Sequence, residues 1–203
     1  MKPLVRIPLP VLLLTFVFAL SSCGDDGEEA FPNLVTEMAD CPTDEAGILQ
    51  SIVLDDDTRL TLSNPRTGLQ ANALYRCLAA YVPDTKGRAT LYSLTSARLL
   101  RDSTAVAQCD PTGVASLWRT RRYINLHLLP KTQGGPPHAW GFVVDSIRPG
   151  HAFLRLHHRQ GSDPAAYTTD LYASLPLDLV EENDTITLRI RTFTGTKEFS
   201  FPQ

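Results

Sequence analysis

The sequence predicts an all-β protein in two parts, a small barrel followed by an antiparallel β-sandwich. Three observations lead to this fold class. Apolar and polar residues alternate with a period of two along both halves of the chain. Pro, Gly and Asp turns interrupt these runs about every eight to twelve residues, which is typical of sandwiches and barrels. Beyond the first 32 residues, no segment carries a sustained apolar stripe at helical spacing.

The chain begins with a secretory signal. Two cations, Lys2 and Arg6, precede an apolar run at 11–20, which has half the roughly 20 residues that a membrane-spanning helix needs. The run ends in Leu-Ser-Ser-Cys, which resembles the lipobox of bacterial lipoproteins. The sequence therefore predicts a lipoprotein signal peptide over 1–22 and lipid attachment at Cys23, where acyl chains would anchor the protein. An ordinary signal peptide cut nearby is the alternative.

Residues 23–40 are predicted to form a lipidated, flexible tether. The stretch GDDGEE at 24–29 is too charged and too rich in glycine to pack. A cysteine followed by acids also resembles the export signal that sends lipoproteins of the Bacteroidetes to the outer face of the outer membrane. A plain spacer that holds the domain off a periplasmic leaflet is the alternative. We therefore expect a lipid-anchored protein of the outer membrane, on either the periplasmic or the surface leaflet.

Residues 41–108 are predicted to form the barrel. Strand patterns run over 47–54, 58–62, 73–82 and 89–100, with an acidic turn at 55–57. The stretch LYRCLAAYV also permits a helix, but the Pro and Gly punctuation favours strand. A sheet with so small a number of strands must close into a barrel to protect its edges, which suits an OB-like form. Residues 101–112 have weak periodicity and are interpreted as a connector.

Residues 109–203 are predicted to form the sandwich. Strand patterns follow over 123–129, 139–147, 151–158, 168–179, 185–193 and 197–201, and the last two flank Thr-Gly as a terminal hairpin. Six strands are enough for two facing sheets with a core between them.

The motifs of this half, among them SLWRTRRYINLHLL, AFLRLHHRQGSD and TITLRIRTF, are similar in order and spacing to the NigD-like lipoproteins of the Bacteroidetes. The acidic turn and a strand with Arg76, Leu78 and Tyr81 extend the resemblance into the first half. The chain departs from that pattern at His157-His158 and at Cys77. The resemblance implies a lipid-anchored protein with an OB-like domain, a β-sandwich and an unknown biochemical role. An immunity factor and a surface adaptor are the two binding roles that we consider for it.

Charge and cysteine content limit the partners. Removal of residues 1–22 would change the formal net charge from −3 to −5, which argues against a nucleic-acid partner. Cys41, Cys77 and Cys109 would then lie in an oxidising compartment, where one pair is expected to close. We expect Cys41 and Cys109, which bracket the barrel, to form that disulfide, although three pairings are open.

The sequence contains no catalytic, cofactor or metal signature that we recognise. The five histidines have no metal-ligand spacing, and no nucleophile elbow occurs. The best candidate binding residues are the basic and aromatic stretch Trp118, Arg119, Arg121 and Arg122, which suits a glycan or phosphate contact or a solvated strand entrance.

A second candidate is the loop at 131–141, with His138 and Trp140, since binding residues often lie on loops. We therefore expect a non-catalytic binding or accessory lipoprotein without a cofactor. Its partners would be the membrane and a protein or glycan, and not nucleic acid. A hydrolase or glycan-handling protein with an unrecognised site is the alternative.

Overall fold

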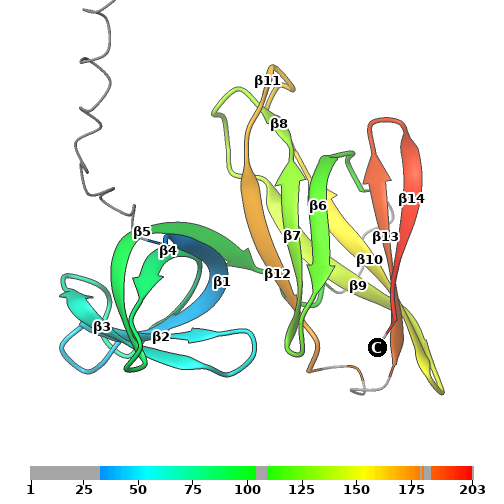
Figure 1. Cartoon of the computed structure of the whole chain (residues 1–203). Helices are drawn as coiled ribbons and strands as arrows, with labels where there is room; N and C mark the ends of the chain where they lie inside the picture. The colour runs from blue at the N-terminus through cyan, green and yellow to red at the C-terminus, as the bar shows by residue number, and fades with distance from the viewer. Residues whose placement is uncertain (1–32, 104–108, 179, 181–183, 203) are drawn as a thin grey trace, which may run out of the picture. The chain divides into compact units, whose positions relative to one another are not determined.

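The computed structural model describes residues 33–103, 109–178, 180 and 184–202, which form strands and turns with no helix. Figure 1 shows them as two β structures connected by β5. The strands are β1 Val35–Pro42, β2 Leu49–Leu54, β3 Arg59–Arg66, β4 Leu74–Pro83, β5 Arg88–Leu99, β6 Gly113–Arg119, β7 Tyr123–Leu129, β8 Lys131–Thr132, β9 Ala139–Arg148, β10 His151–Arg159, β11 Tyr167–Thr168, β12 Leu171–Pro176, β13 Thr185–Thr192 and β14 Gly195–Phe201.

Strands β1–β5 form a closed barrel. They pair in the order β3-β2-β1-β4-β5, and a parallel β3–β5 pairing closes the ring, which removes the free sheet edges. In β3, buried Leu60 and Leu62 alternate with exposed residues, as expected for a strand with one face in a core. The rest of this core includes the aromatic ring of Tyr81 and many small or aliphatic side chains, among them Ala39, Leu49, Ile52, Ala79 and Leu91.

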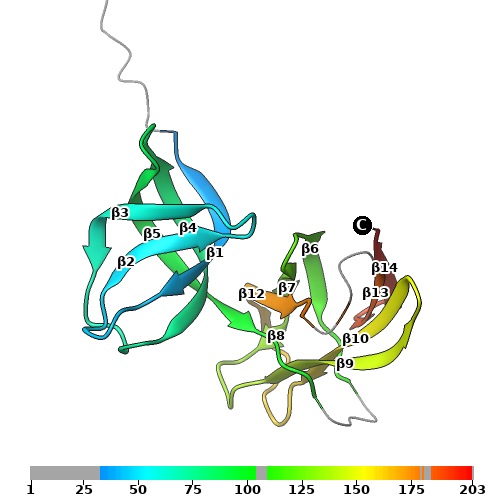
Figure 2. The same cartoon turned by 90° about the horizontal axis from the view of Figure 1, so that it is seen from below.

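The remaining strands form the sandwich. One layer is β12-β7-β6 and the other is β14-β13-β10-β9, with a short β11–β8 ribbon beside them. Figure 2 shows the two layers from below. Their inner faces share an apolar core that includes Ile124, Leu126, Phe142, Leu154 and Leu188.

The barrel and the sandwich share a sheet, because the end of β5 pairs with β12. The partners are Ala173 with Arg98 and Ser174 with Leu99, in parallel. A second parallel pairing joins β10 to β13, so the sandwich is not purely antiparallel. The predicted fold class, a barrel followed by a sandwich, is confirmed.

One local prediction is confirmed and two are wrong. Residues 74–82 are strand, as predicted, so the helical alternative is excluded. Strand β1 begins at Val35, inside the predicted tether. The sequence pattern missed this strand because residues 38–41 are all buried and show no alternation. Strand β6 was absent from the six predicted sandwich strands, since it is a sheet edge with a half-exposed pattern.

The signal peptide, Cys23 and the acidic cluster lie outside the described residues, so those expectations remain predictions. The domain boundary at 108/109 also borders undescribed residues and remains a prediction. No helix among the described residues is long and apolar enough to cross a membrane.

Candidate functional site

The predicted basic residues lie at the β6–β7 turn, where the sandwich faces the barrel. Thr120 closes this turn through its backbone N–H and its hydroxyl, both of which donate to the Tyr123 carbonyl. Arg121 lies 3.3 Å from Asp57 of the barrel. The Arg119 guanidinium extends elsewhere and donates to the backbone carbonyls of Asp184 and Phe201. Arg121 therefore connects the turn to the barrel, and Arg119 connects it to the sandwich.

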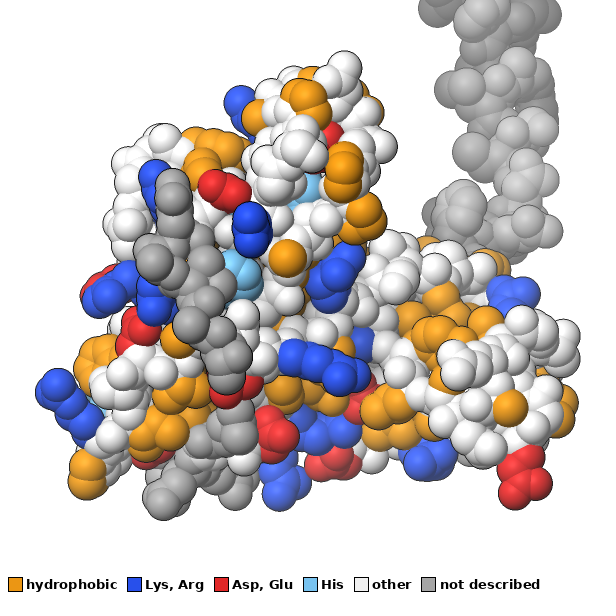
Figure 3. Space-filling model, turned by 180° about the vertical axis from the view of Figure 1, so that it is seen from behind, with side chains coloured by type: hydrophobic (Ala, Val, Ile, Leu, Met, Phe, Trp, Pro, Cys, Tyr) orange, Lys and Arg blue, Asp and Glu red, His pale blue; other side chains and the backbone are white. Residues whose placement is uncertain are grey.

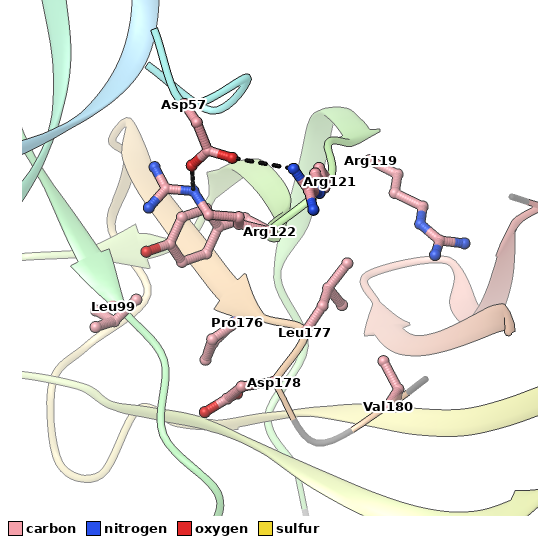
Figure 4. A pocket seen from close by; sticks show the side chains of 10 residues that line it. Asp57, Leu99, Arg119, Arg121, Arg122, Pro176, Leu177, Asp178 and Val180 are labelled. Carbon is pink, nitrogen blue, oxygen red and sulfur yellow. Dashed lines mark hydrogen bonds and ion pairs between the residues drawn. The ribbon is translucent and has the colours of Figure 1, made fainter. Parts of the chain in front are cut away.

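Arg122 binds two carboxylates of the barrel. Its Nη1 lies 2.9 Å from Asp40 and its Nε lies 3.4 Å from Asp57, while Nη2 donates to the Leu54 carbonyl. Figure 4 shows Asp57 between Arg121 and Arg122, with Arg119 directed away from it. Two of the three arginines of the predicted basic stretch, Arg121 and Arg122, are thus paired with barrel acids. Figure 3, which shows the opposite side of the molecule from Figure 1, likewise has basic and acidic side chains interspersed.

Buried Arg76 is the centre of a polar cluster beneath this turn. Its Nη2 lies 2.6 Å from one Asp55 oxygen and its Nη1 lies 3.0 Å from Asp40. Two residues of the sandwich accept the remaining hydrogen bonds of Arg76. Its Nε donates to Ser174 at 2.9 Å and its Nη2 donates to Asn125 at 3.0 Å. The guanidinium also lies 4.0 Å from the Tyr123 ring centre. We call these residues, Asp40, Asp55, Arg76, Tyr123, Asn125 and Ser174, the junction cluster.

The junction cluster fixes the barrel against the sandwich. Asn125 Nδ2 donates to Asp55 at 2.7 Å and the Tyr123 hydroxyl donates to Asp40. Burial and the nearby Asp40 carboxylate raise the Tyr123 pKa, which keeps this hydroxyl a donor. Removing one member of such a network leaves a buried charge uncompensated, so the junction is costly to disturb.

A basic cleft lies on one side of the β6–β7 turn. Its volume is about 580 Å³, and the Arg119, Arg121 and Arg122 side chains reach it (Figure 4). The remaining lining residues are Asp57, Leu99, Tyr123, Pro176, Leu177, Asp178 and Val180.

An acidic cleft lies on another side of the same turn, with a volume of about 630 Å³. Trp118 and Arg121 line it from the sandwich, so the predicted residues of the basic stretch are divided between two clefts. The other lining residues are Thr36, Glu37, Met38, Leu54, Asp55, Asp56, Leu78 and Thr120. Apart from the acidic turn, these residues were not predicted as a binding surface, because nothing in the sequences of β1 or β4 marks one.

The second predicted group, His138 and Trp140, lies elsewhere and is engaged internally. His138 Nε2 contacts Asp163 at 3.0 Å, His138 Nδ1 contacts His158 Nε2 at 3.0 Å, and His158 Nδ1 contacts the Asp110 carbonyl at 3.2 Å. The Trp140 ring stacks on His158 with centroids 3.9 Å apart. The structure thus makes these two residues parts of a packed network.

Hydrogen-bond directions assign the protons in this network. The Asp110 carbonyl only accepts, so His158 donates from Nδ1 and accepts at Nε2. Burial lowers the His158 pKa to about 4, in agreement with a neutral ring. His138 Nδ1 therefore donates to His158 Nε2, and the other His138 nitrogen, Nε2, lies against the Asp163 carboxylate. The Asp163 pKa is lowered to about 2 by its hydrogen bond from Thr132, with further donors from Gln133, His138 and Gly135.

The three described cysteines are buried free thiols, so the predicted Cys41–Cys109 disulfide is absent. Cys41 Sγ donates to the Ala39 carbonyl at 4.0 Å, and interaction with the Cys77 thiol, together with burial, raises the Cys41 pKa. Cys109 instead lies 4.0 Å from His157 Nδ1. The sequence-based pairing was wrong because bracketing a domain in sequence does not bring two residues together in space.

His127 Nε2 contacts Asp170 at 2.6 Å. No group of three His, Cys, Asp or Glu side chains in the described ranges could hold a metal ion.

Comparison with known proteins supports the fold. No family model matches the chain, and no curated protein does. A NigD-like immunity protein from Bacteroides caccae is 24% identical, with 85% of this chain and 98% of that chain covered and a TM-score of 0.66. A candidate toxin-related protein from Parabacteroides distasonis is 13% identical, with coverage of 84% and 93% and a TM-score of 0.70. A candidate lipoprotein from Bacteroides fragilis is 15% identical, with coverage of 84% and 96% and a TM-score of 0.57. The resemblance noted in the sequence is therefore confirmed at the level of the fold: this chain has the architecture of the NigD-like immunity protein.

Proposed function

We propose that this protein is a lipid-anchored, non-catalytic binding protein of the outer membrane that recognises a protein partner at the β6–β7 turn. The observation that carries the proposal is the junction itself. Cavities of about 580 and 630 Å³ lie on two sides of one turn, both within the size range of ligand sites. The buried junction cluster holds their walls in place. A rigid scaffold with open clefts at a domain junction suits recognition.

The structural relatives support the same class. One is an immunity protein and another a candidate lipoprotein, and both are covered over more than nine-tenths of their lengths. An immunity-like role, in which the protein binds a toxin or shields its target, is consistent with a membrane anchor at Cys23 and an acidic tether. A surface adaptor would use the same junction.

Site-specific photo-crosslinking in the native organism tests the binding site. A photo-reactive residue in place of exposed Arg121 should give a discrete crosslinked product. The same residue in place of Ile147, which is 53% exposed on β9, is the control and should give none. Equal products from both positions, or none from position 121, would contradict the proposal. So would a hydrolytic activity that a junction variant abolishes.

A second experiment tests the anchor. Cys23→Ala should leave a non-acylated protein that moves from the detergent phase to the aqueous phase, since the lipid chains supply the attachment. Detergent partitioning at unchanged mass would refute lipidation at Cys23.

A further inference from the structure

The acidic cleft has two apolar walls that face each other across the domain junction. On the barrel side, Met38 and Leu78 are direct partners in the β1–β4 pairing, and Leu54 ends β2 beside them. On the sandwich side the wall is Trp118, which is half-buried. Such walls suit aliphatic or aromatic groups of a ligand.

The β6–β7 register explains why Trp118 faces the barrel. Trp118 pairs with Asn125, and residues directly opposite in an antiparallel pair point to the same face of the sheet. The Asn125 amide reaches Asp55 and Arg76 in the barrel. Trp118 is therefore oriented toward the junction by the same strand pairing that builds the buried cluster.

The rim of the acidic cleft is negative. Glu37 and Asp56 are both exposed, and neither forms an ion pair with a described residue. Glu37 accepts a hydrogen bond from the Tyr81 hydroxyl at 2.9 Å, and Asp56 accepts one from the Thr58 N–H. Burial and these two carboxylates raise the Tyr81 pKa, as a locally negative potential would.

The positive charge at the cleft is already paired. Arg121, the cation that lines it, contacts Asp57 at 3.3 Å, and Asp55 is neutralised by Arg76. Among the described lining residues, Glu37 and Asp56 therefore remain as carboxylates without a described cationic partner, and charge complementarity favours a cationic ligand. A Lys or Arg side chain could also lie against the Trp118 ring, where cation–π attraction adds to packing.

From these observations we propose that the acidic cleft binds a basic, apolar peptide segment of a protein partner. A Lys or Arg of the segment lies beside Glu37 and Asp56, and its aliphatic or aromatic neighbour packs against Trp118 and the Met38–Leu78 wall. This inference rests on the proposed function and specifies the chemistry of the partner.

The test uses the full chain in detergent and three fluorescein-labelled hexapeptides, with binding measured by fluorescence anisotropy. The alternating Lys-Leu peptide should bind, and its affinity should fall as salt rises. The alternating Glu-Leu and Lys-Ser peptides should bind at least about tenfold more weakly, because each lacks one of the two required features.

Variants locate the site. Trp118→Ala should weaken binding of the Lys-Leu peptide by about thirtyfold, the size of effect expected for a central aromatic residue. Trp118→Phe should stay within about threefold of wild type, because it retains the ring. Circular dichroism melting checks that each variant is folded.

A charge pair completes the test. Glu37→Gln with Asp56→Asn should weaken binding by about tenfold and reduce its salt dependence. The matched control is Glu45→Gln with Asp84→Asn, which removes the same two negative charges. Like Asp56, Asp84 is a turn aspartate that accepts backbone hydrogen bonds, in this case in the β4–β5 turn. This control should bind as wild type does.

Stronger binding of the Glu-Leu peptide, which would indicate an anionic ligand at Arg121, would overturn the inference. Unchanged binding by folded Trp118→Ala, or absence of binding by the Lys-Leu peptide, would also overturn it. Crosslinking from position 121 that persists in any of these cases would leave the proposed function standing, so the two failures are distinguishable.

Discussion

Replacement of Arg76 by methionine tests the view that the junction cluster holds the two parts of the protein together. The change keeps much of the side-chain volume and removes the guanidinium. Contacts with Asp40 and Asp55, at 3.0 and 2.6 Å, are lost. So are hydrogen bonds to Asn125 and Ser174.

The expected decrease in the free energy of unfolding depends on which buried carboxylates keep a cationic partner in the variant. Asp40 retains Arg122 at 2.9 Å, so it keeps a cation. Asp55 retains only the neutral Asn125 amide at 2.7 Å, although its side chain is 10% exposed. Leaving one buried carboxylate without its cation lowers the free energy of unfolding by about 3 to 5 kcal/mol. Arg76→Met should have an effect of this size.

Urea unfolding measured by two probes provides the assay. Both tryptophans lie in the sandwich, so their fluorescence reports that part, while far-ultraviolet circular dichroism reports all strands. The two midpoints should coincide in the wild type and separate in Arg76→Met, as the shared cluster no longer couples the parts. The double variant Asp55→Asn, Arg76→Met should regain at least about half of the lost stability, because no carboxylate remains unpaired at position 55. A loss below about 1 kcal/mol, or a double variant as unstable as the single one, would refute the reasoning.

Three further predictions concern stability and thiol reactivity. Because the folded-state pKa of His158 is about 4, below the ordinary value of 6.5, unfolding takes up a proton between these pH values. Stability should therefore fall as pH drops from about 6.5 toward 4. Urea titrations at several pH values should show a weaker pH dependence for His158→Gln than for the wild type. An unchanged pH dependence would show that groups other than His158 cause it. Gly47→Ala should destabilise the barrel by more than about 2 kcal/mol, because φ is +71° and a Cβ would lie 2.2 Å from the Leu69 carbonyl oxygen. Gly87→Ala, with the same φ but no atom within 4 Å, should cost about 1 kcal/mol, and equal thermal shifts would remove the role of the clash. The three described cysteines should resist a thiol reagent in the folded protein and react only after unfolding, which mass spectrometry detects; fast reaction in the folded state would contradict their burial.

The residues of the junction cluster lie in sequence motifs that were used to predict the fold, but the sequence did not predict that these motifs would meet. The acidic turn, the Arg76 strand and the Tyr123–Asn125 strand were each recognised as motifs. Their meeting was not predictable, since Arg76 and Ser174 are 98 residues apart and no local rule states which strands become neighbours. Alternation identifies strands with one buried face, and it failed at β1, where Met38, Ala39, Asp40 and Cys41 are all buried.

The candidate binding residues were predicted less well than the fold. Residue type selected Trp118 and the arginines of the turn, and the structure does place them at cavities. The same criterion selected His138 and Trp140, whose polar and aromatic groups are satisfied inside the protein by Asp163 and His158. Type and spacing cannot tell a side chain that awaits a ligand from one that already has an internal partner.

The composition of the junction cluster has a consequence for the order in which the protein is built. Asp40, Asp55 and Arg76 all belong to the barrel, so the ribosome completes this charged set before β7 and β12 are synthesised. The later half supplies the neutral groups of Tyr123, Asn125 and Ser174 to the cluster. The barrel thus brings two buried carboxylates to one guanidinium, and the second cation, Arg122, arrives only with the later half of the chain. The pairing of β5 with β12 spans about seventy-five residues and carries a large loop-closure cost, so docking of the sandwich would be the slow, late step of folding.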